Sequence, residues 1–241
     1  DLFAHVSQCL RRELTELIPL PETRLKSGTV LVVGLGNRGV TPDSLGPRVA
    51  ERVFVTRHIK EHMPEAFDFD IPSVCAIAPG VLGVTGVETM DIVFGVANKV
   101  KPDLIIAVDA LASRRAARIS TTIQLSDSGI SPGSGVGNTR ADLSRANLGV
   151  PVIAVGVPLV VYASTISQDT ISLIADETGL HGDEERLREL AEQVIAKHMG
   201  DFIVTPKDID VIVEDMAGII ANAINSALFG NNLEQVRNML A

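Results

Sequence analysis

The sequence predicts an α/β fold: a mostly parallel sheet flanked by helices, with a helical C-terminal part. Two observations predict it. Short apolar runs alternate with segments of helical periodicity along the first part of the chain, which is typical of βαβ units with right-handed crossovers. From residue 164 onward the apolar residues recur at helical spacing. We expect one α/β domain over 1–241, with an N-terminal helix over 1–18, a sheet core over 28–160 and the helical part over 164–241.

The first element is an amphipathic helix over 1–18, because apolar residues recur there at helical spacing until two prolines end the pattern. Strands and helices then alternate. The expected elements are a strand over Val30–Val33, a helix over Leu45–Ile59, a strand over Val74–Ile77, a helix over Val87–Val100, a strand over Leu104–Val108 that ends at Asp109, a strand near Ile119–Leu125 and a strand over Val152–Val157. The C-terminal helices are expected over 164–178, 183–198, 207–228 and 232–240.

The composition fits a globular protein of 241 residues, 46% of them hydrophobic. The net charge is −9 and the acidic residues are scattered, so no concentrated basic face is available to bind nucleic acid or an anionic membrane. Cys9 and Cys75 are too few for a disulfide framework and fit a reducing compartment. No apolar run reaches the roughly 18 residues of a membrane span. We therefore expect a cytoplasmic protein.

The stretch VVGLGNRGVTPDSLGP, Val32 to Pro47, is the most informative part of the chain. An apolar run ends in glycines there, and Asp43 follows where a helix should begin. Parallel α/β folds place their ligands at the carboxyl ends of the strands, so this stretch brings backbone amides and a carboxylate to that edge. Position alone also favours Asp43 as a helix N-cap, a role that requires no chemistry.

Asp109 has a weaker structural explanation, because it ends an all-apolar strand where an uncompensated carboxylate costs several kcal/mol. If the two strands are neighbours, Asp43 and Asp109 converge over the same sheet edge. Two carboxylates that close cannot both ionise freely, so one of them holds a proton near neutral pH. A carboxylate that activates water beside a carboxylic acid is the minimum equipment for peptide hydrolysis.

Two glycine motifs do not fit the enzymes that they formally match. The GxGxxG pattern that begins at Gly34 lacks a helix start at its third glycine, because Pro42 follows too soon, and we expect no nucleotide cofactor. In the GxSxG pattern from Gly129 to Gly133, the residue after Ser131 is Pro132, which has no N–H to serve an oxyanion hole.

The glycine-rich segments remain candidates for substrate binding. The loop from Pro132 to Asn138 contains more glycine than a connector needs, and its amides suit an anion or a peptide carbonyl as well as a purely conformational role. The candidate substrate-binding residues are Gly34, Gly36, Asn37, Gly133, Ser134, Gly135 and Asn138.

Several blocks of the sequence resemble the germination proteases of spore-forming bacteria. They are VVGLGNRGVTPDSLGP, VFVTRHI, APGVLGVTGVETMDIV, KPDLIIAVDALASR, SDSGISPGSGVGN and LGVPVIAVGVP, in that order. The resemblance runs from about Val32 to Thr170 and resumes in FIVTPKDIDVIVEDMAGIIANAINSAL. It implies a fold similar to that of hydrogenase maturation proteases. It also implies an endopeptidase of the spore core that degrades small acid-soluble spore proteins during germination, is made as a zymogen and assembles as a homotetramer.

The resemblance also assigns site residues. The aspartates thought to be catalytic in the family lie in its TPD and VDAL motifs, which correspond here to Asp43 and Asp109. Tyr162 replaces an aspartate of the family's VVDA pattern, and we expect it to make the pocket less acidic. We expect no cofactor and no metal. Two alternatives stay open: a metal-dependent peptidase that uses the same carboxylates, and a non-catalytic sporulation relative.

Overall fold

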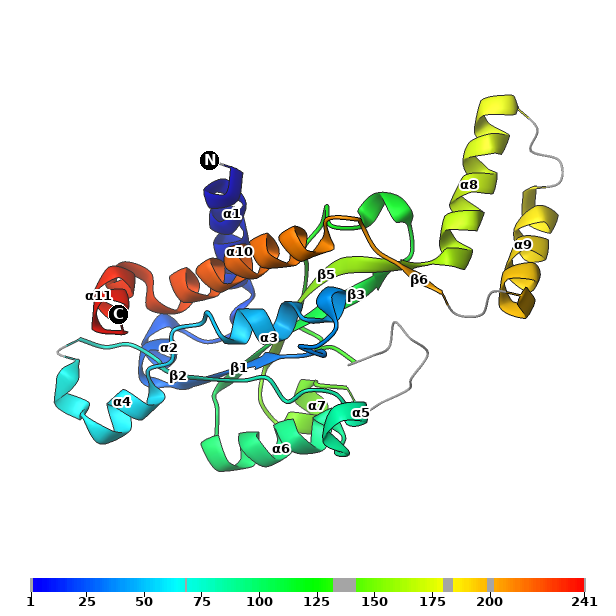
Figure 1. Ribbon diagram of the computed structural model, residues 1–241. Helices are drawn as coiled ribbons and strands as arrows, with labels where there is room; N and C mark the ends of the chain where they lie inside the picture. Colours follow the sequence, from blue (N-terminus) through cyan, green and yellow to red (C-terminus); the bar gives the residue numbers. More distant parts are fainter. Residues whose placement is uncertain (1, 68, 132–141, 180–183, 199–201, 241) are drawn as a thin grey trace.

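The computed structural model of the chain describes residues 2–67, 69–131, 142–179, 184–198 and 202–240. These residues form a mixed α/β structure around a six-stranded sheet of order β2-β1-β3-β5-β4, with β6 paired to β5 (Figure 1). The strands are β1 Thr29–Gly34, β2 Ser73–Ile77, β3 Leu104–Ser113, β4 Gln124–Ser126, β5 Val152–Tyr162 and β6 Ile203–Val204. Strands β2, β1, β3 and β5 are mutually parallel, whereas β4 and β6 run antiparallel to β5. The predicted fold class is thereby confirmed.

Helices cover both faces of the sheet. The α-helices are α1 Leu2–Leu17, α2 Glu22–Ser27, α3 Leu45–Ala50, α4 Arg57–His62, α5 Leu82–Thr85, α6 Thr89–Val100, α7 Arg145–Leu148, α8 Ala163–Thr178, α9 Glu184–His198, α10 Ile209–Phe229 and α11 Leu233–Leu240. Short 3₁₀ turns are η1 Thr41–Asp43, η2 Pro64–Ala66, η3 Ala116–Arg118 and η5 Gly230–Asn232. The helices predicted at the N-terminus and after residue 164 are confirmed, with bounds that differ by at most two residues.

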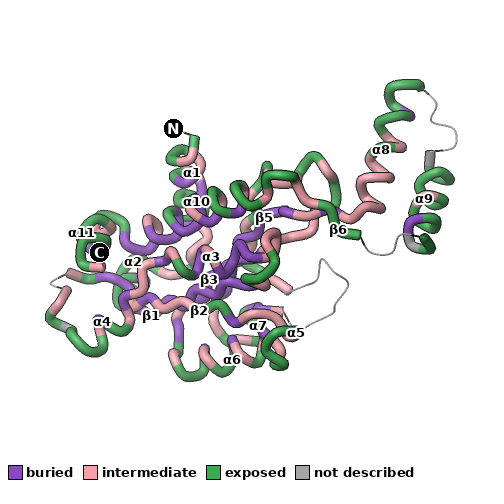
Figure 2. Tube along the Cα trace, in the orientation of Figure 1, coloured by how far each residue is buried: buried purple, intermediate pink, exposed green. Residues whose placement is uncertain are grey.

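The period-two alternation of the strands builds two apolar layers. On one face, Ile106 and Val108 of β3 pack with α1, α3 and α10. On the other face, Ile105 and Ala107 pack with α6 and α7. Burial is concentrated in the strands and along α10, whereas the α8–α9 hairpin stands away from the sheet at the end of β5 (Figures 1 and 2).

Helix α10 is a core helix. A window within Ile209–Leu240 is long and apolar enough to cross a membrane by length and composition, and among the described residues it is the one candidate. Half of that window is buried inside the fold, where α10 packs on α1 and α3. Its apolar character is therefore explained by burial against the sheet.

The predicted helix over Leu45–Ile59 is wrong, because the structure divides it into α3 and α4. Between the end of α3 at Ala50 and the start of α4 at Arg57, main-chain groups form hydrogen bonds with distant parts of the chain instead of helical ones. Phe54 N–H donates to Oδ1 of Asn225 on α10 at 2.9 Å, and Thr56 N–H donates to the Val74 carbonyl of β2 at 2.9 Å. These long-range partners override the local helical pattern.

Three predicted strand ends are also corrected. Strand β3 continues past Asp109 to Ser113, and β5 continues past Val157 to Tyr162, because the two strands pair with each other along this extension. The strand expected near Ile119–Leu125 shrinks to β4 at Gln124–Ser126. Before it, the chain turns through Ser120, which has a φ of 59°.

The Asn225 side chain generates a test of this core. It is 3% exposed, and it bonds to both Phe54 N–H and the Arg52 carbonyl. The Asn225→Ala variant leaves both main-chain groups without this partner, so we expect its unfolding free energy to fall by about 2–4 kcal/mol. Urea denaturation measures the loss. The exposed Asn222 on the same helix supplies the matched control, Asn222→Ala. Equal unfolding free energies of the two variants would contradict a stabilising role of the two Asn225 hydrogen bonds.

Candidate active site

The chain folds tightly between β1 and α3 to present Asp43. Leu35 N–H continues the ladder by donating to the Val108 carbonyl at 2.8 Å, after which the chain leaves the sheet. Gly36 has a φ of 112°, and a Cβ at this residue would lie 2.1 Å from the Asp43 carbonyl oxygen. Only glycine permits that approach. The turn η1 then places Asp43 directly above the loop that follows β1.

The interpretation of Asp43 as a helix N-cap is wrong. Ser44 takes the N-cap position of α3, and Asp43 belongs to η1. The Asp43 carboxylate accepts the N–H of Asn37 at 2.7 Å, so it bonds to the loop after β1 rather than to the first turn of the helix. The position before α3 is therefore used to hold a carboxylate over the sheet edge.

Asp109 lies at the same edge for a different reason. Gly34, the last residue of β1, is paired with Val108, so Asp109 is the first residue of β3 beyond the end of β1. On its other side Asp109 is opposite Gly156 of β5. The side chain is buried, with 5% of the residue exposed, and it accepts Ala110 N–H at 2.9 Å.

The structure brings the two carboxyl groups into electrostatic contact. Burial, the larger cause, and the negative charge of Asp43 together raise the pKa of Asp109 to about 8, while the hydrogen bond from Ala110 N–H opposes the shift. Burial also raises the pKa of Asp43, while the hydrogen bond from Asn37 N–H lowers it. The pair therefore holds a proton at neutral pH, on Asp109, beside a less buried carboxylate.

A polar chain connects the Asp43 turn to helix α10. Ser44 is fully buried, and its Oγ donates to the Thr41 carbonyl at 2.8 Å and accepts Nε of Arg48 at 3.0 Å. Arg48 in turn pairs with Glu214 of α10 at 2.7 Å, and Arg52 pairs with the same carboxylate. Sequence reasoning missed these residues. The spacing of Ser44 and Arg48 on one helical face was the available signal, whereas the Glu214 contact is purely tertiary.

The predicted substrate-binding residues divide into two groups. Gly34 has a packing role, because a Cβ there would lie 2.1 Å from the Gly46 carbonyl oxygen of α3. Gly36 and Asn37 form the loop that holds Asp43. The other candidates lie outside the described residues: Gly133, Ser134, Gly135 and Asn138.

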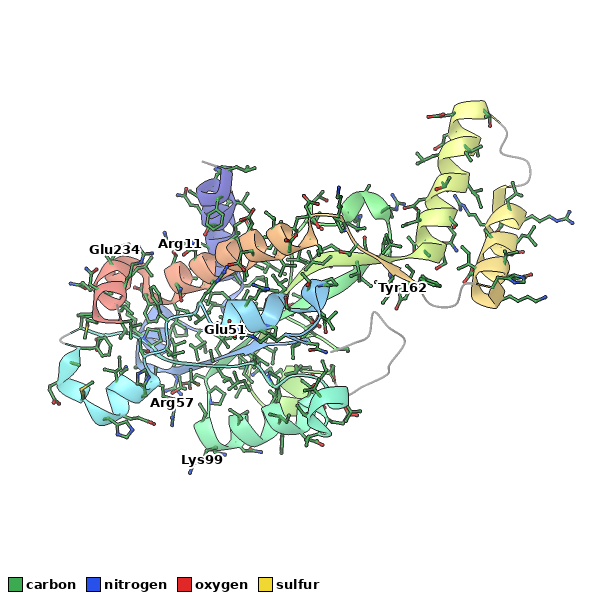
Figure 3. The ribbon with its side chains drawn as sticks, in the orientation of Figure 1. Arg11, Glu51, Arg57, Lys99, Tyr162 and Glu234 are labelled. Atoms are coloured by element: carbon green, nitrogen blue, oxygen red, sulfur yellow. The ribbon has the colours of Figure 1, made fainter. Side chains whose placement is uncertain are left out.

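Tyr162 is remote from the carboxyl pair. It lies six residues further along β5 than Gly156, the residue opposite Asp109, which is roughly 20 Å of strand. It pairs with Ile203 of β6 at the base of the α8–α9 hairpin (Figure 3). The expectation that Tyr162 changes the acidity of the pocket is therefore wrong.

The part of the chain that the structure describes contains no group of three or more His, Cys, Asp or Glu side chains placed to hold a metal ion. As metal ligands, Asp43 and Asp109 would offer only carboxylate oxygens. Such a pair suits a hard cation poorly without further ligands.

Comparison with known proteins identifies the class of the protein. A family model described as germination protease matches residues 1–185 and 177–239. The germination protease of Caldanaerobacter subterraneus subsp. tengcongensis is 47% identical over 253 residues, which cover 100% of this chain and 77% of the relative. That of Clostridium tetani is 45% identical over 237 residues, which cover 93% of this chain and 72% of the relative. The chain is thus an endopeptidase. It belongs to the germination protease family.

Among solved structures, the chain is similar to the [NiFe] hydrogenase maturation protease HycI from Thermococcus kodakarensis KOD1. The likeness has 18% identity and a TM-score of 0.44, and it covers 88% of this chain and 97% of the other.

The raised pKa of Asp109 predicts a pH-dependent stability. The folded protein retains a proton that the unfolded chain releases, so raising the pH from about 4 to about 8 favours unfolding, by at most about 1.4 kcal/mol per pH unit. The unfolding free energy of the wild type minus that of Asp109→Asn should therefore fall over this range and level off above it.

Urea denaturation at several pH values measures this difference. The exposed Asp91 on α6 provides the control, Asp91→Asn, which removes a surface carboxylate instead of a buried one. A difference between the wild type and Asp109→Asn that does not change with pH would contradict the protonated state of Asp109.

Proposed function

We propose that this endopeptidase hydrolyses peptide bonds with Asp43 and Asp109 as its catalytic pair. The observation that carries the proposal is the burial of Asp109 beside a second carboxyl group at the carboxyl edge of a parallel sheet. Carboxyl groups whose environments push their pKa values apart supply an acid and a base at one pH. The matching TPD and VDAL motifs of the family support the same two residues.

The two carboxyl groups have different roles in this proposal. Asp43, less buried and bonded to Asn37 N–H, is the ionised base. It removes a proton from water as the water oxygen bonds to the substrate carbonyl carbon. Asp109 is the protonated acid and gives its proton to the substrate, and the leaving amine carries it away when the C–N bond breaks. One water is consumed, and the proton taken up by Asp43 restores the protonation of the pair.

The resemblance to the family supports a proposal for the substrate and the setting. We propose that small acid-soluble spore proteins are the substrates, cleaved in the spore core during germination. The zymogen state and the homotetramer implied by the resemblance belong to the same proposal. Protein substrates as a class are already given by membership of a protease family.

Single substitutions test the catalytic pair. Asp43→Asn and Asp109→Asn each remove a proton-transferring group, so we expect either variant to lose about 10²–10⁴-fold in kcat. The assay is cleavage of a purified small acid-soluble spore protein, with fragments identified by mass spectrometry. Circular dichroism checks that both variants fold, and Asp91→Asn controls for loss of a surface carboxylate.

The same assay separates the alternatives. Full activity of either aspartate variant would refute the pair. Loss of wild-type activity after exhaustive chelation, restored by a divalent cation, would favour the metal-dependent version. A wild-type protein that produces no defined fragments would favour a non-catalytic relative.

A further inference from the structure

Among the described residues, the sheet has an open edge beside the carboxyl pair. Strand β1 ends at Gly34, opposite Val108, but β3 continues to Ser113. Along this extension β3 is paired with β5 on one side. Among the described residues, no strand pairs with Ala110–Ser113 on the other side, where β1 has already ended.

The main chain of β3 alternates between its two neighbours. Ile105 N–H donates to the Pro151 carbonyl next to β5, whereas the Val108 carbonyl accepts Leu35 N–H on the β1 side. Alternate residues of a strand direct their N–H and C=O to the same side, so Ala110 faces the open edge. The β3–β5 register shifts between Leu111 and Ala112, but the extra residue, Leu159, belongs to β5, so the alternation of β3 continues and Ala112 faces the same edge. The Ala110 N–H is already bonded to Asp109, which leaves the Ala110 carbonyl and both main-chain groups of Ala112 along this edge.

The open edge is continuous with the site. The hydrogen bond from Ala110 N–H places the Asp109 carboxyl group at the first residue of the edge. The Asp43 turn contacts β3 and β5, so it lies close to this part of the sheet. The Leu111 side chain occupies the space that a Cβ at Gly156 would need, so β3 and β5 are in close contact at these residues.

We propose that the protein substrate binds as an added strand along Ala110–Ser113. An extended segment pairs with the Ala110 carbonyl and with both main-chain groups of Ala112, and it carries its scissile bond past Asp109. Main-chain pairing requires the substrate to be unfolded at the cleavage site, so the enzyme takes extended segments in preference to helical or folded ones. This inference rests on the proposed function, because it uses the position of the catalytic pair.

A scan of N-methylated peptides tests the added strand. The probe is a synthetic peptide of about twelve residues that spans a bond cleaved in the spore protein. N-methylation at one position at a time removes single N–H donors. We expect losses of about tenfold in kcat/KM at alternate positions and little effect between them, because alternate residues of a strand face the enzyme edge. Losses without a period of two, or none, would overturn the inference.

Variants of the enzyme test the same edge. Ala112→Pro removes an N–H that faces the open side, where proline is tolerated in a strand. We expect it to raise KM about tenfold with kcat little changed. Ala112→Val keeps the N–H and is the matched comparison, so we expect its KM to rise less than that of Ala112→Pro. Equal KM values for these two variants would contradict the pairing. If Ala112→Pro fails to fold, the peptide scan decides.

The two proposals fail in distinguishable ways. Aspartate variants that cleave normally, with a period-two response to N-methylation, would refute the catalytic pair and support the edge. Inactive aspartate variants, with no periodic response in the wild type, would support the pair and refute the edge.

Discussion

The burial of the Asp109 carboxyl group is the constraint on which the rest of the site depends. An ionised carboxylate in that position would be costly, and the negative charge of Asp43 adds to the cost. The Ala110 N–H offsets only part of it. Protonation resolves the conflict, and the result is a carboxylic acid at neutral pH next to a carboxylate. The offset between the ends of β1 and β3 creates this environment, because it leaves Asp109 just past the last pairing with β1.

The fold fixes Asp43 from two directions. From the sheet, Gly36 allows the loop to fold back, so that Asn37 N–H reaches the carboxylate. From α10, the pairing of Glu214 with Arg48 holds Ser44, whose Oγ bonds to the turn that contains Asp43. Ser44 is the fully buried member of this chain, and the more exposed Arg48–Glu214 pair connects it to α10. Helix α10 thus serves both as the core of one layer and as the support of the site.

The sequence predicted the fold class, the terminal helices and the aspartates at the sheet edge. These features depend on local signals: apolar periodicity for the elements, and the position of an acidic residue after an apolar run for Asp43 and Asp109. The split between α3 and α4 was not predictable, because it depends on Phe54 bonding to a residue 171 positions away. The length of β3 was missed because its extension is stabilised by β5, and the strand runs through a buried carboxyl group that sequence patterns treat as an end.

The central claim is that Asp109 is protonated in the folded protein at neutral pH, and infrared spectroscopy of protein labelled with ¹³C-carboxyl aspartate tests it directly. Subtracting the Asp109→Asn spectrum isolates the carboxyl band of this residue. The account predicts a protonated C=O band that persists at pH 7 and titrates with a midpoint near the pKa of about 8. A band that disappears at the ordinary pKa of an aspartate, about 4, would contradict it.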